Sequence, residues 1–226
     1  MVELEGTLKW FKRDKSPGPD GWLVEFYTAF LDISGLDILV VIEESQTLGR
    51  IFPPSTSLIS PLIQKFDSPS SFNDFRPISL CNCLYKIIAN IIANHIRPIL
   101  SNHISHEQFA FLHHRHIQES IGSAQEALHS IKFKKLKGMD LKINLTKAFD
   151  KVSWLYLRMM LTHLGFPLEF INWIMGCITS VSFVILINGL ASHSFQADKG
   201  IRQGFPLSPL PFLLVMEGLS KLIDSE

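Results

Sequence analysis

The segment LKINLTKAFDKVSW, residues 141–154, is where the sequence comes closest to catalytic chemistry. Its apolar residues Leu141, Ile143 and Leu145 alternate with polar ones, and a helix-like pattern follows. This predicts a strand that leads into a helix. A polar side chain near the end of such a strand is well placed to bind a metal ion or a phosphate group. A carboxylate would suit a hard cation best, but the chain has Asn144 at that position.

Four lysines stand close together upstream of that segment, in KFKKLKG at residues 132–138. They are Lys132, Lys134, Lys135 and Lys137. Such a cluster is either a solvated loop or a contact for the phosphate backbone of a nucleic acid. The histidines of HHRH, residues 113–116, have no Cys or carboxylate at ligand spacing, and Cys81 and Cys83 form one pair without a second. The sequence therefore predicts no zinc site, and the two cysteines are expected to pack at a helix start.

Helices are the main elements that must position these residues. Apolar residues at helical spacing predict them over residues 22–46 (as two short helices broken at Ser34-Gly35), 84–98, 117–131, 153–164 and 168–179. A last helix is expected after Ser208, with Pro209 in its first turn. Strands are expected at 141–145 and at 182–187, where Asn188-Gly189 predicts a hairpin. The segment 57–64 supports at most a short edge strand or an extended loop. The first residues, up to the turn SPGPDG at 16–21, are expected to form a tail.

Composition narrows the class of protein. The chain has 226 residues, 46% of them hydrophobic, and its 21 Lys and Arg balance its 21 Asp and Glu. No global positive field therefore attracts nucleic acids, so any such contact must be local. Three cysteines without an apolar signal segment indicate a reducing, intracellular compartment, cytoplasmic or nuclear. No apolar run reaches the length of a membrane span.

Five stretches, in order along the chain, carry a resemblance to a known family. They are SPGPDGW, DFRPISLCNCLYKIIANIIANHIRPIL, HEQFAF, INLTKAFDKVSW and NGLASHSFQADKGIRQGFPLSP. Together they resemble the reverse-transcriptase domain of LINE-type non-LTR retrotransposons, closest to the copies found in plant genomes. The resemblance implies an α+β fold made of polymerase fingers and an incomplete palm, rich in helices and with a small antiparallel sheet. It also implies an RNA template and a DNA primer as partners, and Mg²⁺ as the cofactor of active relatives.

The same resemblance divides the chain and assigns roles to residues. Residues 1–21 would be a tail and turn, 22–140 a fingers-like region, and 141–226 a partial palm. Lys65 and Arg76 would meet the phosphates of an incoming nucleotide, Phe149 would exclude a 2′-hydroxyl, and Gln203 and Gly204 would contact nucleotide and template. Two simpler interpretations stay open: Arg76 as an exposed residue before Pro77, and Phe149 as part of the core.

Departures from the family pattern predict lost activity. Asn144 stands where relatives have the first metal-binding Asp, and Asp150, six residues on, is expected to be structural. Phe205 replaces an acid in RQGDPLSP, and LHHRHI replaces VPGR-x-I. The Asp-Asp hairpin, the thumb and the endonuclease domain of full elements are not found in this sequence.

These departures lead to one main expectation and two alternatives. We expect a truncated, degenerate copy of the domain, with little or no polymerase activity alone. The alternatives are a non-catalytic module that binds RNA or DNA, and a translated remnant without a function.

Overall fold

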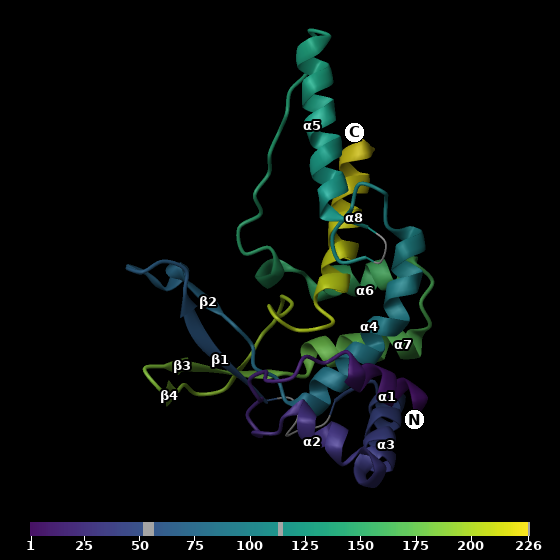
Figure 1. Ribbon diagram of the computed structural model, residues 1–226, viewed down its shortest axis with the longest axis vertical. Helices are drawn as coiled ribbons and strands as arrows, with labels where there is room; N and C mark the ends of the chain where they lie inside the picture. Colours follow the sequence, from purple (N-terminus) through teal and green to yellow (C-terminus); the bar gives the residue numbers. More distant parts are fainter. Residues whose placement is uncertain (52–56, 113–114, 226) are drawn as a thin grey trace.

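A computed structural model describes residues 1–51, 57–112 and 115–225 (Figure 1). Its helices are α1 (Val2–Lys9), α2 (Val24–Ala29), α3 (Leu31–Leu48), α4 (Cys83–His103), α5 (Ile117–Phe133), α6 (Trp154–His163), α7 (Leu168–Thr179) and α8 (Pro209–Asp224). Its strands are β1 (Ser57–Gln64), β2 (Phe75–Pro77), β3 (Ser182–Ile187), β4 (Leu190–Ala191) and β5 (Phe195–Gln196). The expected α+β fold, helix-rich with a small sheet, is confirmed.

Helix α4 forms the centre of the core. Its isoleucines repeat at helical spacing and present one continuous apolar face, on which Ile88 and Ile92 are fully buried. Helices α1 and α8 pack against it. Pro98 lies inside the helix, which continues to His103, so the proline does not end it.

The N-terminal residues do not form the expected tail. Leu4 and Leu8, four residues apart on one face of α1, are buried, and α1 packs on α4. His95 of α4 meets the Glu3 carboxylate at 2.6 Å, which joins the two helices at the surface. Helix formation by this segment is explained by the apolar surface that α4 offers, and no single-segment pattern reveals that partner.

Helices α2 and α3 meet at Phe30, not at the predicted break. Gly35 lies inside α3, and the end of the Met1 side chain fills the space where a Cβ would stand. The glycine therefore serves packing and not a turn. Further along α3, Ser45 accepts a hydrogen bond of 3.0 Å from Trp173 Nε1 of α7, and both residues are buried.

The sheet is mixed and not wholly antiparallel, which corrects the sequence expectation. Its order is β2-β1-β3-β4, with β5 paired to β3. Strand β1 pairs in parallel with β3, because helices α4 to α7 carry the chain back between them. Strand β1 also pairs with β2, so it is not an edge strand. The hairpin at Asn188-Gly189 is confirmed, and both residues have the positive φ that such a turn requires.

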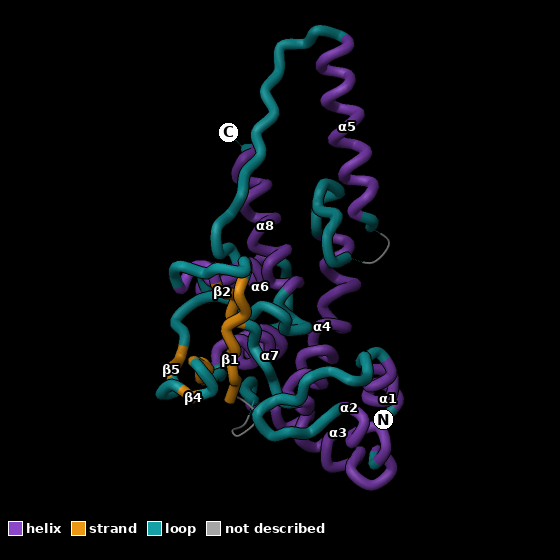
Figure 2. Tube along the Cα trace, turned by 60° about the vertical axis from the view of Figure 1, so that its left-hand side comes forward, coloured by secondary structure: helices purple, strands orange, loops and turns teal. Residues whose placement is uncertain are grey.

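No strand forms at 141–145, so that prediction is wrong. The whole segment is exposed and pairs with no described strand. An alternating pattern defines two faces, but a strand also needs a neighbouring edge to satisfy its backbone. Helix α5 likewise has no buried residue. Residues 117–145, here called the arm, extend away from the body as a helix with an irregular returning segment (Figures 1 and 2).

The described helices include none with the length and hydropathy needed to cross a membrane. All three cysteines are free and buried. Burial raises the pKa of Cys177 to about 12, an effect that the nearby Arg202 partly opposes.

The arm should be the least stable part of the chain. A 17-residue helix without a buried residue is marginal in water, whereas α4 is held by the core. In hydrogen exchange followed by mass spectrometry, the amides of α5 are expected to exchange early and those of α4 late. Helix α7, shorter than α5 but buried, is the internal control. Equal protection of α5 and α7 would contradict this description of the arm.

Candidate nucleotide and nucleic-acid site

A buried arginine anchors the loop that precedes α8. Arg202 is 6% exposed and donates to the carbonyl oxygens of Cys177 (2.7 Å) and Ile178 (2.8 Å) in the last turn of α7. It also donates to the Tyr85 hydroxyl of α4 at 2.5 Å. The Tyr85 hydroxyl in turn donates to the Cys177 carbonyl. One guanidinium group thus joins α4, α7 and the loop before α8. It thereby fixes the positions of the neighbouring Gln203 and Gly204.

Phe205 closes this cluster. It is buried, and the guanidinium carbon of Arg202 lies 4.6 Å from the centre of its ring and 5.1 Å from that of Tyr85. Two ring faces therefore contribute cation–π attraction to a cation that has no carboxylate partner among the described residues. Burial raises the pKa of Tyr85 well above its ordinary value, so the hydroxyl stays neutral. Phe205, a departure from the family pattern, thus has a structural role.

The Arg202 loop is also joined to the segment after Asn144. Gly200 N donates to Val152 O at 2.7 Å, and Ile201 N donates to Phe149 O at 2.9 Å. Trp154 Nε1 donates to Gly200 O at 2.7 Å. Gly200 has a φ of +89°, and a Cβ on it would lie 2.8 Å from Asp150 O, so the close approach requires glycine.

Gln203 lines a pocket between these segments and the sheet. The pocket has a volume of about 230 Å³ and an apolar floor that includes Phe183 and Phe195. Asp150 and Lys199 supply charge at its edge, and Pro77 of β2 contributes from the other side. The structure therefore brings Gln203 next to Asp150, residues that are far apart in sequence.

Lys65 and Arg76 lie together on the hairpin of β1 and β2. Arg76 is paired with Ile63, and Lys65 follows two residues later, so both side chains belong to one face of the hairpin. Both are exposed. Pro77, the next residue, lines the Gln203 pocket, and because successive side chains of a strand alternate, Lys65 and Arg76 lie on the opposite face of the hairpin from that pocket.

Asn144 lies apart from Gln203. It lines a different pocket, of about 510 Å³, together with Phe212 and Val215 of α8. Phe149 is half-buried and stacks on Phe212 with ring centres 4.4 Å apart, which fits the simpler interpretation of Phe149 as part of the core. Asn144 and Asp150 therefore face different spaces.

The arrangement does not fit a two-metal site. An amide is a neutral ligand, Asp150 lines another pocket, and the described residues hold no group of three or more potential metal ligands. His113 and His114 lie outside the described residues. We derive no catalytic step through Mg²⁺ from these residues.

The four lysines Lys132, Lys134, Lys135 and Lys137 lie at the outer end of the arm, where α5 ends and the chain returns (Figure 1). All are exposed. The structure does not bring them near the β1–β2 hairpin or Gln203. Any contact that they make is separate from the pocket that Gln203 lines.

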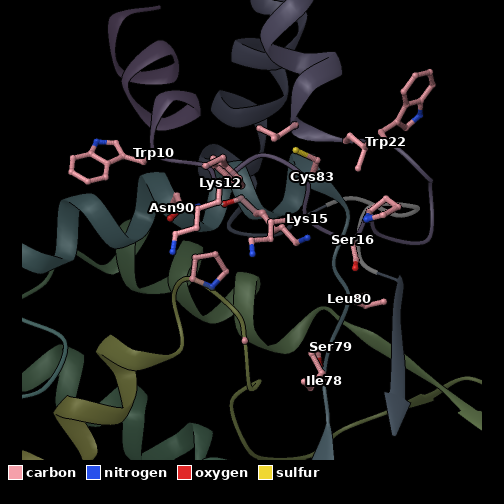
Figure 3. Close-up of a pocket in the computed structure, with 17 residues that line it drawn as sticks. Trp10, Lys12, Lys15, Ser16, Trp22, Ile78, Ser79, Leu80, Cys83 and Asn90 are labelled. Atoms are coloured by element: carbon pink, nitrogen blue, oxygen red, sulfur yellow. The ribbon is translucent and has the colours of Figure 1, made fainter. Parts of the chain in front are cut away.

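Sequence reasoning missed a basic pocket beside the loop that precedes α8. It has a volume of about 530 Å³ and adjoins Gly204. Figure 3 shows Lys12 and Lys15 extending toward its middle, with Trp10 at one edge and Trp22 at the opposite edge. Lys86 of α4 completes a set of three cations, and none has a hydrogen-bond or ion-pair partner among the described residues. No Asp or Glu is among the described residues that line the pocket, which we call the N-terminal basic pocket.

Comparison with known proteins identifies the family. Residues 63–226 match the family described as reverse transcriptase (RNA-dependent DNA polymerase). This chain belongs to that family, and the sequence-based expectation of a reverse-transcriptase domain is confirmed.

The relatives come from transposable elements of the non-LTR class. The "Transposon TX1 uncharacterized 149 kDa protein" of Xenopus laevis is 28% identical over 96% of this chain and 17% of its own length. A "Retrovirus-related Pol polyprotein from type-1 retrotransposable element R2" of Popillia japonica is 23% identical over 96% of this chain and 30% of its own. The corresponding R2DM protein of Drosophila melanogaster is 29% identical over 68% of this chain and 14% of its own. The chain thus spans less than a third of each of these proteins.

Removal of the Arg202 side chain should destabilise the fold. Arg202→Ala leaves the buried Ile178 carbonyl without its donor, removes one of two donors to the Cys177 carbonyl and takes away a partner of the Tyr85 hydroxyl, and a buried unsatisfied group costs about 1–3 kcal/mol. We expect a loss of about 3 kcal/mol in urea unfolding followed by circular dichroism. Arg76→Ala is the control because that side chain is exposed, and it should change stability little. A similar stability for the two variants would show that the Arg202 contacts are not needed.

Proposed function

We propose that this chain is the fingers and part of the palm of a LINE-type reverse transcriptase that binds nucleic acid but does not polymerise by itself. The observation that carries the nucleic-acid part is the N-terminal basic pocket. It concentrates three unpaired lysines in a chain whose formal net charge is zero. A local cationic site of this kind attracts a phosphate backbone without a global positive field.

The tryptophans at the pocket edges support a single-stranded ligand. Trp10 is 84% exposed and Trp22 is 48% exposed, which is unusual for such large apolar side chains. Unpaired bases stack on exposed aromatic rings while lysines follow the phosphates, and this combination binds single strands with little sequence preference. Because Gly204 lines the same pocket, a strand there would lead to the loop that carries Gln203.

The nucleotide-binding roles inferred from the family remain part of this proposal. Lys65 and Arg76 would contact the phosphates of a nucleotide from the hairpin face, and Gln203 and Gly204 would contact its base and the template. Phe149 would stand near the sugar. Their support is the hairpin face that Lys65 and Arg76 share and the separate pocket that Gln203 lines. The lysines at the end of the arm would form a separate contact with the nucleic-acid backbone.

Binding to a single strand should depend on the three pocket lysines. Each lysine that neutralises a phosphate contributes about 0.7 to the slope of log affinity against log salt for single strands. Lys12→Gln/Lys15→Gln/Lys86→Gln should therefore weaken binding and lower that slope by about 2. The measurement is fluorescence anisotropy of a labelled single-stranded uridylate oligonucleotide over a series of salt concentrations.

A charge-matched variant controls for net charge. Lys9→Gln/Lys142→Gln/Lys151→Gln removes the same charge from exposed lysines outside the pocket and should leave the slope nearly unchanged. Equal losses in the two variants would reject the N-terminal basic pocket as the binding site. A separate variant, with the four lysines at the end of the arm changed to Gln, tests that second contact.

Polymerase activity should be absent and should not return with one substitution. Asn144→Asp restores a carboxylate, but Asp150 lines another pocket, so a second ligand is still missing. Groups that act as a unit give little gain when only one is repaired. We expect no template-dependent incorporation of labelled nucleotide with Mg²⁺ or Mn²⁺ by the unmodified chain or by Asn144→Asp.

A fusion of this chain to the Asp-Asp hairpin and thumb of an intact relative serves as the positive control. It should extend a primer only when residue 144 is Asp. Extension by the unmodified chain alone would overturn the proposal that it is inactive.

A further inference from the structure

Two ammonium groups converge on one neutral residue between the hairpin and the Phe149 segment. Asn73 lies in the turn that joins β1 to β2. Its backbone carbonyl accepts from Lys65 Nζ, and its side-chain oxygen accepts from Lys147 Nζ at 2.8 Å. Lys65 and Lys147 are far apart in sequence, so this is a tertiary contact between two parts of the chain.

The positive charges of Lys65 and Lys147 are not neutralised in this contact. Neither lysine has an ion pair among the described residues, and Asn73 offers only neutral oxygens. Both lysines are exposed, so they keep part of their hydration. An anionic oxygen adds Coulomb attraction to the hydrogen bonds that these ammonium groups already form with neutral oxygens. An anion that reached this point would displace the two oxygens of Asn73.

The backbone at Lys147 fixes the direction from which its side chain approaches. Lys147 has a φ of +53°, in the left-handed region, and Asp150 N donates to Lys147 O at 3.1 Å to close a turn. The following residues, Phe149 and Val152, are held to the Arg202 loop by backbone hydrogen bonds. Lys147 is thus set on a turn with a rigid attachment, in contrast to the lysines of the arm.

We propose that Lys147 is a further phosphate-binding residue for a nucleoside triphosphate. When no nucleotide is bound, the oxygens of Asn73 occupy the place of the phosphate oxygens. The inference rests on the proposed nucleotide site, to which it adds a cation from outside the hairpin. Lys65 and Lys147 would meet the phosphates from two sides, while Arg76 lies on the hairpin face. Nucleotide binding would then exchange the contacts with Asn73 for contacts with phosphate.

The test is binding of a fluorescent deoxyadenosine triphosphate to the full chain, measured by anisotropy. Lys147→Gln should weaken binding about 10- to 100-fold, the effect of losing one hydrogen bond between charged groups. Lys147→Arg keeps the charge and should restore most of the affinity. Lys142→Gln, an exposed lysine of the neighbouring segment, is the matched control and should bind as the unmodified chain does.

Two further measurements complete the test. Asn73→Ala removes the competing side-chain oxygen and should bind the triphosphate at least as tightly as the unmodified chain. Unlabelled deoxyadenosine, which has no phosphate, should not compete, whereas inorganic tripolyphosphate should. Circular dichroism of each variant checks that it is folded.

The outcomes separate this inference from the proposed function. Binding by the unmodified chain together with unchanged affinity of Lys147→Gln would overturn the role of Lys147 alone. Equal losses in Lys147→Gln and Lys142→Gln would do the same, because they would indicate a general charge effect. No triphosphate binding by the unmodified chain would overturn the nucleotide site itself.

Discussion

The buried guanidinium of Arg202 is the interaction on which the site depends. A cation in a protein interior is costly unless it is well paired, and here no described carboxylate serves it. Its partners are instead the Cys177 and Ile178 carbonyls, which lie in the last turn of α7, where the helix dipole is negative and carbonyl groups lack helical partners. The faces of Tyr85 and Phe205 cover the rest. One side chain therefore satisfies a helix end, fixes the loop before α8 and, through Gly200, holds the Phe149 segment in place.

The sequence predicted correctly those elements that can be recognised from their own residue pattern. Helices α4, α6 and α7 follow from apolar stripes, and the hairpin at Asn188-Gly189 follows from turn chemistry. Prediction from the sequence failed where contact with a distant part of the chain determines whether an element forms. Helix α1 forms because α4 receives Leu4 and Leu8, whereas the segment 141–145 has the alternation of a strand but finds no edge to pair with. Periodicity describes the face of an element and leaves its partner open.

The residues of the candidate site likewise fall into those that the sequence predicted and those that it misplaced or missed. The family motifs led to Lys65, Arg76 and Gln203; the first two share one face of the hairpin, and Gln203 lines the pocket on its other face. Asn144 was expected beside them but lines a pocket against α8, because the strand that would have aligned it is absent. The N-terminal basic pocket escaped detection since Lys12, Lys86 and Gly204 come from three distant segments. A linear motif search cannot find such a set, although isolated tryptophans and lysines in a supposed tail were a usable signal.

The parallel pairing of β1 with β3 has a consequence for how the chain is made. During synthesis β1 leaves the ribosome well before its parallel partner, which follows only after helices α4 to α7. Contacts between such distant segments form slowly, because the intervening chain must be ordered first. Until then β1 has only β2 as a neighbour, and its other edge is open to strands of other chains. Nascent chains would therefore need protection along this edge more than along any helix, because the sheet is completed only after these helices have been made.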